Sequence, residues 1–213
     1  MSAHDLFEFD KKQNELIIGT DEAGRGPAAG GVFASAVYFP QSNPELIDAL
    51  ATLNDSKKLT SQKRESLYDI IKNNTINSTV CIEVEEIEEI NILNASLKAM
   101  KLACENVIQA AEKNGFLTLV DGNRLIKNYT HPQKYIIKGD SKSAAIAAAS
   151  ILAKVTRDRY MTELDKICPQ YGWANNAGYL TKAHMEAIDK YGLSKYHRPS
   201  FLKKHFEKQL QLF

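Results

Sequence analysis

Apolar and polar residues along the chain follow two different periods. Short runs rich in β-branched and aromatic residues predict strands, and longer stretches with apolar residues every three or four positions predict helices. The first 14 residues are mostly polar, and we expect them to be loosely held. The predicted strands are Leu16–Thr20, Val32–Phe39, Thr79–Val84, Phe116–Val120 and Tyr135–Ile137.

Helical patterns fill the segments between and after these strands. A helix begins after a cap at Thr60 or Ser61, and a longer helix follows the third strand. From Ser143 onward the chain is mainly helical, apart from a break near Pro169. The apolar stripe of the long helix consists of Leu97, Met100, Cys104, Val107, Ile108 and Ala111.

The order of the predicted elements indicates an α/β fold. Two strands, a helix, a strand, a helix and two more strands precede the final helices, which favours a mixed sheet flanked by helices. A chain of 213 residues is long enough for one domain with a substantial core. We therefore expect a single catalytic domain over 1–213, with its core at about 15–160 and a C-terminal helical region at about 161–213.

Composition excludes several classes of protein. The chain is 44% hydrophobic, which excludes a disordered chain. The longest apolar run, 144–153, is mostly alanine and too short to span a membrane. The first residues lack the basic and apolar regions of a secretory signal. The three cysteines, Cys81, Cys104 and Cys168, form no zinc or disulfide pattern, so we expect a cytoplasmic protein, and a monomer.

Charge is distributed unevenly along the chain. The net charge is +1, but residues 1–120 carry 18 acidic and 11 basic side chains, and residues 121–213 carry 8 and 16. Such an asymmetry favours a polyanionic partner such as nucleic acid. Ordinary solvated faces would explain the same numbers if the two halves interleave in the fold.

Acidic residues follow three of the predicted strands. Asp21 and Glu22 follow the first strand, Asp121 the fourth and Asp140 the fifth. Ligand sites of open α/β sheets form at strand ends, where four carboxylates would repel one another unless cations bound them. Oxygen ligands suit Mg²⁺ or Mn²⁺, and two such ions about 3.5–4 Å apart promote phosphodiester displacement. Polar turns also place acids after strands, which is the simpler alternative.

A glycine-rich turn separates the first two strands. Residues 24–29 match the pattern G-x-G-x-x-A, but a strand and not a helix follows, which argues against a dinucleotide site. Glycine lets the backbone approach a ligand closely, and Arg25 can hold a phosphate. The alternative is a tight turn with a solvated arginine.

The segment 21–27, DEAGRGP, resembles the signature of ribonuclease HII. Further blocks resemble the family at 53–59, 89–93, 120–123, 138–141, 148–158 and 197–201. The resemblance implies a ribonuclease H-like fold with a C-terminal helical region. It also implies an endonuclease that cuts RNA in RNA–DNA hybrids and acts in ribonucleotide removal during replication and repair. Such an enzyme cuts 5′ to single ribonucleotides in duplex DNA and leaves 3′-hydroxyl and 5′-phosphate ends.

The resemblance also implies roles for individual residues. The metal-binding acids of the family match Asp21, Glu22, Asp121 and Asp140. The backbone that contacts the 2′-hydroxyl matches Gly24, Arg25 and Gly26. The tyrosine that stacks on the sugar matches Tyr179. Before Gly178 the family more often has His-Lys than the residues present here. The sister family, ribonuclease HIII, usually has Thr at the position of Arg25.

Several basic residues are candidates for phosphate contacts. Lys57, Lys58 and Lys142 can serve this role, although a solvated basic face explains them equally well. Asp158 lies between Arg157 and Arg159, and we interpret it as a partner in an ion pair and not as a metal ligand.

The last five residues carry two alternative interpretations. The segment 209–213 resembles the pentapeptide that bacterial replication proteins insert into the sliding clamp, and short apolar anchors suit such a groove. Its candidate anchors are Gln209, Leu210, Leu212 and Phe213. Alternatively, Leu202, Phe206, Leu210 and Phe213 continue one helical stripe that packs on the body of the protein.

Two other functions fit the same fold. A binding protein without catalysis would lack one of the four acids, and all four are present. A nuclease that resolves DNA junctions would not need the Gly-Arg-Gly turn or Tyr179. We therefore favour the ribonuclease.

Overall fold

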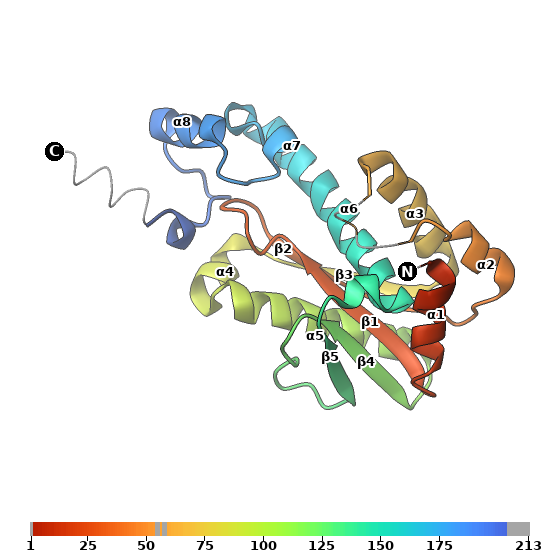
Figure 1. Ribbon diagram of the computed structural model, residues 1–213. Coiled ribbons are helices and arrows are strands. Elements are labelled where there is room, and N and C mark those ends of the chain that lie inside the picture. The colour runs from red at the N-terminus through yellow and green to blue at the C-terminus, as the bar shows by residue number, and fades with distance from the viewer. Residues whose placement is uncertain (1, 54–55, 57–58, 204–213) are drawn as a thin grey trace.

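The computed structural model describes residues 2–53, 56 and 59–203 (Figure 1). The predicted contacts Lys57 and Lys58 lie outside the described residues, and so do the tail residues Gln209, Leu210, Leu212 and Phe213. Within the described part of the chain, no helix is long and apolar enough to cross a membrane.

A five-stranded mixed sheet forms the centre of the molecule, as predicted. Its strands are β1 (Leu16–Ala23), β2 (Val32–Tyr38), β3 (Ile76–Ile82), β4 (Phe116–Asp121) and β5 (Gln133–Ile136). They lie in the order β3-β2-β1-β4-β5. The pairs β1–β2 and β2–β3 are antiparallel, and β1–β4 and β4–β5 are parallel. The carboxyl ends of β1, β4 and β5 therefore meet at one edge of the sheet.

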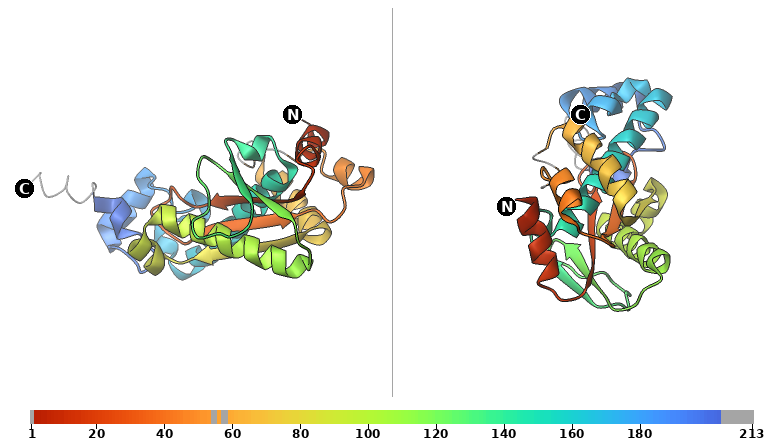
Figure 2. Two further views of the ribbon diagram at one scale, coloured as in Figure 1. Left: turned by 90° about the horizontal axis from the view of Figure 1, so that it is seen from below. Right: turned by 90° about the vertical axis from the view of Figure 1, so that its right-hand side faces the viewer.

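Helices cover both faces of this sheet (Figures 1 and 2). Helix α5 packs on one face, and α6 packs on the other face together with α1 and α3. The short helices α7 and α8 lie at the far end of α6 (Figure 1). The helices are α1 (Ala3–Lys11), α2 (Pro44–Ala49), α3 (Ser61–Asn74), α4 (Val84–Ile90), α5 (Ile92–Ala111), α6 (Ala144–Ile167), α7 (Trp173–Asn176) and α8 (Lys182–Tyr191), with 3₁₀ turns η2 (Gly139–Ser141) and η3 (Pro169–Tyr171).

The alanine-rich start of α6 lies directly against β1. A Cβ atom on Gly19 would fall 2.2 Å from the backbone of Ala145, so only glycine allows this approach. The side chain of Ser143 caps the helix by accepting a hydrogen bond from the Ile146 amide at 3.2 Å. This close packing places the N-terminus of α6, and η2 before it, beside the carboxyl end of β1.

The expectation of a loosely held N-terminus is wrong. Residues 3–11 form α1, whose start is closed by a reciprocal cap between Ser2 and Asp5. Leu6 and Phe7 are buried in the core cluster that contains α3 and α6. The helix is short and has few apolar positions, so its pattern is weak in sequence although its contacts are extensive.

The ends of several strands differ by a few residues from those predicted from the sequence. Strand β3 begins at Ile76 and ends at Ile82, before the predicted segment ends, because Glu83 and Val84 start α4. Strand β5 ends at Ile136 and is followed by Lys138 in a left-handed conformation (φ 55°). Strand β1 continues to Ala23, three residues beyond its predicted end.

Candidate active site

Two strands and one turn bring the predicted acids to the same edge of the sheet. Asp21 and Glu22 lie inside β1 and do not follow it, because β1 pairs with β2 as far as Ala23. Asp121 is the last residue of β4, and the parallel register sets Thr20 beside Val120. Asp21 and Asp121 are therefore neighbours on adjacent strands.

Asp140 reaches this edge from η2, the turn between β5 and α6. The amide of Gly139 donates a hydrogen bond to Asp121 Oδ1 at 2.6 Å, which ties the turn to the end of β4. A Cβ atom on Gly139 would fall 2.5 Å from Ile146 Cδ1, so a glycine allows the turn to pack here. Asp140 itself is buried.

Electrostatics show that the four acids share one site. The pKa of the Asp21 carboxyl is raised well above its usual range, first by burial and then by the negative charges of Glu22, Asp121 and Asp140. The Glu22 amide opposes this shift by donating to Asp21 Oδ1 at 2.7 Å. The structure therefore brings the four acids to one edge of the sheet.

The donors fit a hard divalent cation. All four are carboxylates, and a cation among them would remove the repulsion that raises the pKa of Asp21. Among the described residues, no three acidic, histidine or cysteine side chains already converge as metal ligands.

A cavity of about 290 Å³ opens beside Asp21 and Glu22. The same cavity is lined by the glycine-rich turn and by Tyr179, the tyrosine predicted to contact the sugar. Its lining consists of Asp21, Glu22, Ala23, Gly24, Arg25, Gly26, Ser56, Ser150, Lys154, Arg157 and Tyr179.

The turn after β1 needs a glycine at position 24. Gly24 has φ +100°, and a Cβ atom there would fall 2.2 Å from Arg157 Nε. A Cβ atom on Gly26 would lie 3.4 Å from Tyr179 Cε1, so the tyrosine ring stands next to the turn. Arg25 Nη1 lies 3.1 Å from Glu22 Oε1. Strand β2 follows at Val32, as expected for a turn that is not a dinucleotide site.

Tyr179 is held by its backbone while its side chain remains 52% exposed. The carbonyl of Gly178 accepts a hydrogen bond from the Ala28 amide at 2.9 Å. The carbonyl of Tyr179 lies 2.9 Å from Nδ1 of His184, which is buried in α8. The tyrosine therefore reaches the cavity, although Asn176 and Ala177 stand before Gly178 in place of the expected His-Lys.

Besides Ala23 in the turn itself, four lining residues were not predicted as part of the site. Ser150, Lys154 and Arg157 follow one another at spacings of four and three on α6, which puts them on one helix face. Ser56 joins them because the Ser150 hydroxyl donates to Ser56 Oγ at 2.7 Å. This spacing, within the block 148–158 that resembles the family, could have indicated in the sequence that these residues share a helix face near the site.

The predicted residues Asp121, Asp140 and Lys142 do not line this cavity, and neither does Asp158. Lys142 follows Asp140 by two residues and is half-buried at the start of α6. Asp158 forms ion pairs, as expected, but with Lys154 at 2.5 Å and Arg64 at 3.9 Å, and not with its sequence neighbours.

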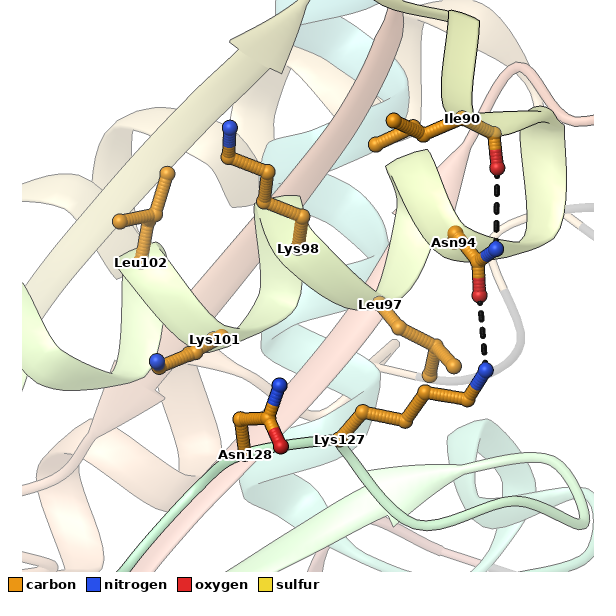
Figure 3. Close-up of a pocket in the computed structure, with 8 residues that line it drawn as sticks. All are labelled: Ile90, Asn94, Leu97, Lys98, Lys101, Leu102, Lys127 and Asn128. Carbon is orange, nitrogen blue, oxygen red and sulfur yellow. Dashed lines mark hydrogen bonds between the residues drawn. The ribbon is translucent and has the colours of Figure 1, made fainter.

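A larger cavity of about 480 Å³ lies between α5 and the loop after β4 (Figure 3). None of the predicted site residues lines it. Lys127 Nζ donates to Asn94 Oδ1 at 3.0 Å, and Lys98 pairs with Glu86, so two of its amines already have partners. A search for the site by cavity size alone would therefore have selected a cavity that none of the predicted acids lines.

Comparisons with known proteins identify the family of this chain. The family model described as Ribonuclease HII matches residues 18–209. A ribonuclease HII of Fusobacterium nucleatum is 48% identical over 203 residues, covering 95% of this chain and 91% of that protein. One of Rickettsia bellii is 50% identical over 200 residues, covering 93% and 96%.

Solved structures share the fold. The ribonuclease H2 of Pyrococcus horikoshii aligns with a TM-score of 0.71 and 26% identity, covering 90% of this chain and 97% of that one. The ribonuclease HII in a complex with PCNA from Archaeoglobus fulgidus aligns with a TM-score of 0.68 and 23% identity, covering 86% and 93%. The ribonuclease H-like fold is thus confirmed, and this chain, a nuclease of the ribonuclease H type that acts on RNA–DNA substrates, belongs to the ribonuclease HII family.

Proposed function

We propose that this enzyme degrades the RNA strand of RNA–DNA hybrids and also cuts duplex DNA on the 5′ side of a single embedded ribonucleotide. The products carry 3′-hydroxyl and 5′-phosphate ends, and the activity serves ribonucleotide removal in DNA replication and repair. One observation supports this proposal above others: a single cavity joins Asp21 and Glu22 to residues 24–26 and Tyr179.

Recognition of a lone ribonucleotide depends on its 2′-hydroxyl, the only group that distinguishes it from its neighbours. Residues 24–26 can offer backbone amides to that hydroxyl, and the exposed ring of Tyr179 offers a flat surface to the sugar. Both lie beside the acids, so a phosphate next to the recognised sugar would reach the reacting position. Arg25, Lys142 and Lys57 are our proposed phosphate contacts.

We further propose Mg²⁺ or Mn²⁺ as cofactor, held by Asp21, Glu22, Asp121 and Asp140, with two ions acting together. Bound divalent ions supply the charge that lowers the pKa of an attacking water and stabilises the leaving oxygen. The chain's own part is to hold the ions and the scissile phosphate in a fixed arrangement. One structural relative of the same fold, Bst-RNase HIII, has been solved in complex with Mn²⁺.

A cleavage assay tests this function directly. A DNA duplex with one ribonucleotide is incubated with Mg²⁺ or Mn²⁺, beside an all-RNA strand paired with DNA, and a chelator serves as control. We expect a metal-dependent cut 5′ to the lone ribonucleotide. Cleavage of the long hybrid alone would contradict the proposed role of residues 24–26 and Tyr179, and no cleavage of either by the folded protein would contradict the function.

The clamp is our proposed protein partner, through residues 209–213. A structural relative has been solved as a complex of PCNA with ribonuclease HII. Purified sliding clamp should retain the full chain and not a chain truncated after Lys208. Equal retention of both forms would end this proposal.

We also propose that the enzyme is a cytoplasmic monomer. All three cysteines are free thiols, as in a reducing compartment.

A further inference from the structure

Two arginines are buried behind the glycine-rich turn. Arg157 belongs to α6 and Arg198 follows α8, and their exposed fractions are 2% and 0%. Neither forms an ion pair with a carboxylate of the described residues. Burial lowers the pKa of Arg157, and burial with the nearby charge of Arg157 lowers the pKa of Arg198 to about 9. A guanidinium remains charged in proteins. A buried charge is costly unless hydrogen bonds satisfy it, so their partners matter.

Arg198 donates only to main-chain carbonyls of the turn. Its Nη1 donates to Gly24 O at 2.8 Å and to Pro27 O at 2.9 Å. Its Nε and Nη2 both donate to Gly30 O, at 2.9 and 2.6 Å. The Arg198 amide adds a hydrogen bond to Ala28 O at 2.7 Å. One residue thus fixes four peptide groups between positions 24 and 30.

Arg157 extends this arrangement to the tyrosine. Its Nη2 donates to Ala29 O at 3.1 Å and its Nε to Gly31 O at 3.3 Å. Its Nη1 donates to Ala177 O at 3.0 Å, two residues before Tyr179. The same guanidinium therefore links the turn to the segment that carries the exposed ring.

One of these contacts decides where the Arg25 amide points. All peptide bonds of the described residues are trans, so each N–H points opposite to the carbonyl of its own peptide group. The carbonyl of Gly24 points toward Arg198, and the Arg25 amide therefore points away from it. Among the described residues, the amides of Arg25 and Gly26 donate to no protein group, and both residues line the cavity.

We propose that Arg198 is a specificity-determining positioning residue. Its buried guanidinium holds the Gly24–Arg25 peptide group, and the carbonyls of Pro27 and Gly30 beyond it, so that the Arg25 amide faces the cavity and selects a ribose oxygen, while Arg157 holds Tyr179 in register with it. The inference rests on the proposed function, because it explains how the turn is kept ready for a 2′-hydroxyl. A guanidinium suits this task because its planar fork donates in several fixed directions, whereas an ammonium is a single point.

Arg198→Lys is the variant that tests the proposal. Lysine keeps the positive charge but cannot reach Gly24, Pro27 and Gly30 together. We measure kcat/KM for the single-ribonucleotide duplex and for the long hybrid, at one fixed Mg²⁺ concentration. We expect kcat/KM for the single-ribonucleotide duplex, divided by kcat/KM for the long hybrid, to fall about tenfold. A misplaced amide loses its contact with the 2′-hydroxyl, and the single-ribonucleotide duplex offers only one such hydroxyl.

Matched variants separate positioning from folding. Arg159→Lys changes an arginine of α6 that pairs with Glu65 outside the cavity, and we expect it to leave the ratio unchanged. If Arg198→Lys fails to fold, the same ratio of kcat/KM values is measured for Arg157→Lys instead. An unchanged ratio in the folded variant, or an equal loss on both substrates, overturns the proposal. If the wild-type protein does not cut the single-ribonucleotide duplex, the proposed function fails instead.

Discussion

Asp121 shows how one carboxylate serves both the fold and the chemistry. Its Oδ1 accepts the Gly139 amide at 2.6 Å, while its charge contributes to the cluster around Asp21. Asp121→Asn keeps an oxygen acceptor for Gly139 but removes the negative charge. We expect cleavage to fall at least about a hundredfold with an unchanged melting temperature, because catalysis by divalent ions depends on the charge of their ligands. A variant with near-normal cleavage would refute the metal-binding role.

Tyr179 offers a second test at a single residue. Its ring is half exposed beside Gly26, so truncation removes contact area without opening the core. We expect Tyr179→Ala to lower kcat/KM about tenfold for the single-ribonucleotide duplex, and less for the long hybrid, because stacking on an aromatic ring contributes roughly 1–3 kcal/mol. Tyr191→Ala, a half-exposed tyrosine at the end of α8, is the control. Equal losses on both substrates would count against a role in ribonucleotide selection.

The predictability of the site differs from residue to residue. The convergence of Asp21, Asp121 and Asp140 could be expected because each lies in, or a few residues after, a strand near the same edge of the sheet. The roles of Arg157 and Arg198 could not, because a sequence shows a basic residue without showing whether its side chain is buried. Only the fold reveals that both donate to carbonyls far away in the sequence.

At the scale of elements, a buried pair of histidines joins α8 to the segment after it. Nε2 of His184 lies 3.1 Å from Nε2 of His197 and also accepts a hydrogen bond from Trp173 Nε1 at 3.1 Å. The amide of Ser194 donates to Nδ1 of His197 at 3.0 Å. His197 therefore donates to His184 through Nε2–H, and both rings are neutral in this arrangement.

This pair predicts a titration well below the ordinary range of histidine. Burial, and then the neighbouring His184, lower the pKa of His197 to about 4. Because the folded state binds this proton more weakly than the unfolded state, the group's contribution to stability is complete above about pH 6.5 and decreases as the pH falls toward 4. NMR titration of the imidazole protons should show His197 neutral at pH 5.5. A midpoint near 6.5 would contradict the structure.

Direct observation of the imidazole is preferable to a global unfolding curve. Burial raises the pKa of the Asp10 carboxyl to about 6, so Asp10 binds its proton more strongly in the folded state. Its effect on stability between pH 4 and 6 has the opposite sign to that of His197, and the two partly cancel.

Helix α1 is the element that the sequence pattern missed, and its contribution can be measured. Leu6 is 1% exposed within the core cluster of α3 and α6. We expect Leu6→Ala to lower the free energy of unfolding by about 2–4 kcal/mol, because the substitution leaves a cavity in a packed core. Urea denaturation gives the value, with Glu8→Ala on the exposed face as control. Equal stability of the two variants would mean that α1 is not part of the folded core.

For the whole molecule, the order of the strands could be predicted better than their ends. Period and order predicted a mixed sheet with a helical C-terminal region, because these depend on patterns that extend over many residues. The ends of β1 and β3 and the existence of α1 depended on contacts between distant segments. At Gly19, for example, the backbone of α6 approaches β1 so closely that no side chain fits, which no local pattern shows.

The uneven charge of the chain predicts how its affinity responds to salt. The basic excess lies in residues 121–213, which include α6 with Lys154 and Arg157 at the cavity, whereas the acids Asp21 and Glu22 come from the acidic half. Contacts to phosphates release counterions, so binding weakens as salt concentration rises. With about three phosphate contacts, we expect KM for the single-ribonucleotide duplex to rise roughly 10- to 100-fold between 50 and 200 mM KCl.

Fixed Mg²⁺ keeps the acidic cluster equally occupied through this salt series, so the change in KM reports phosphate contacts and not metal binding. The value of kcat at saturating substrate should change little, because salt acts on the encounter with the duplex and not on groups buried behind the turn. Arg25→Gln removes one candidate phosphate contact and should reduce the salt slope by about one. A KM that does not change with salt would show that the basic half does not face the substrate.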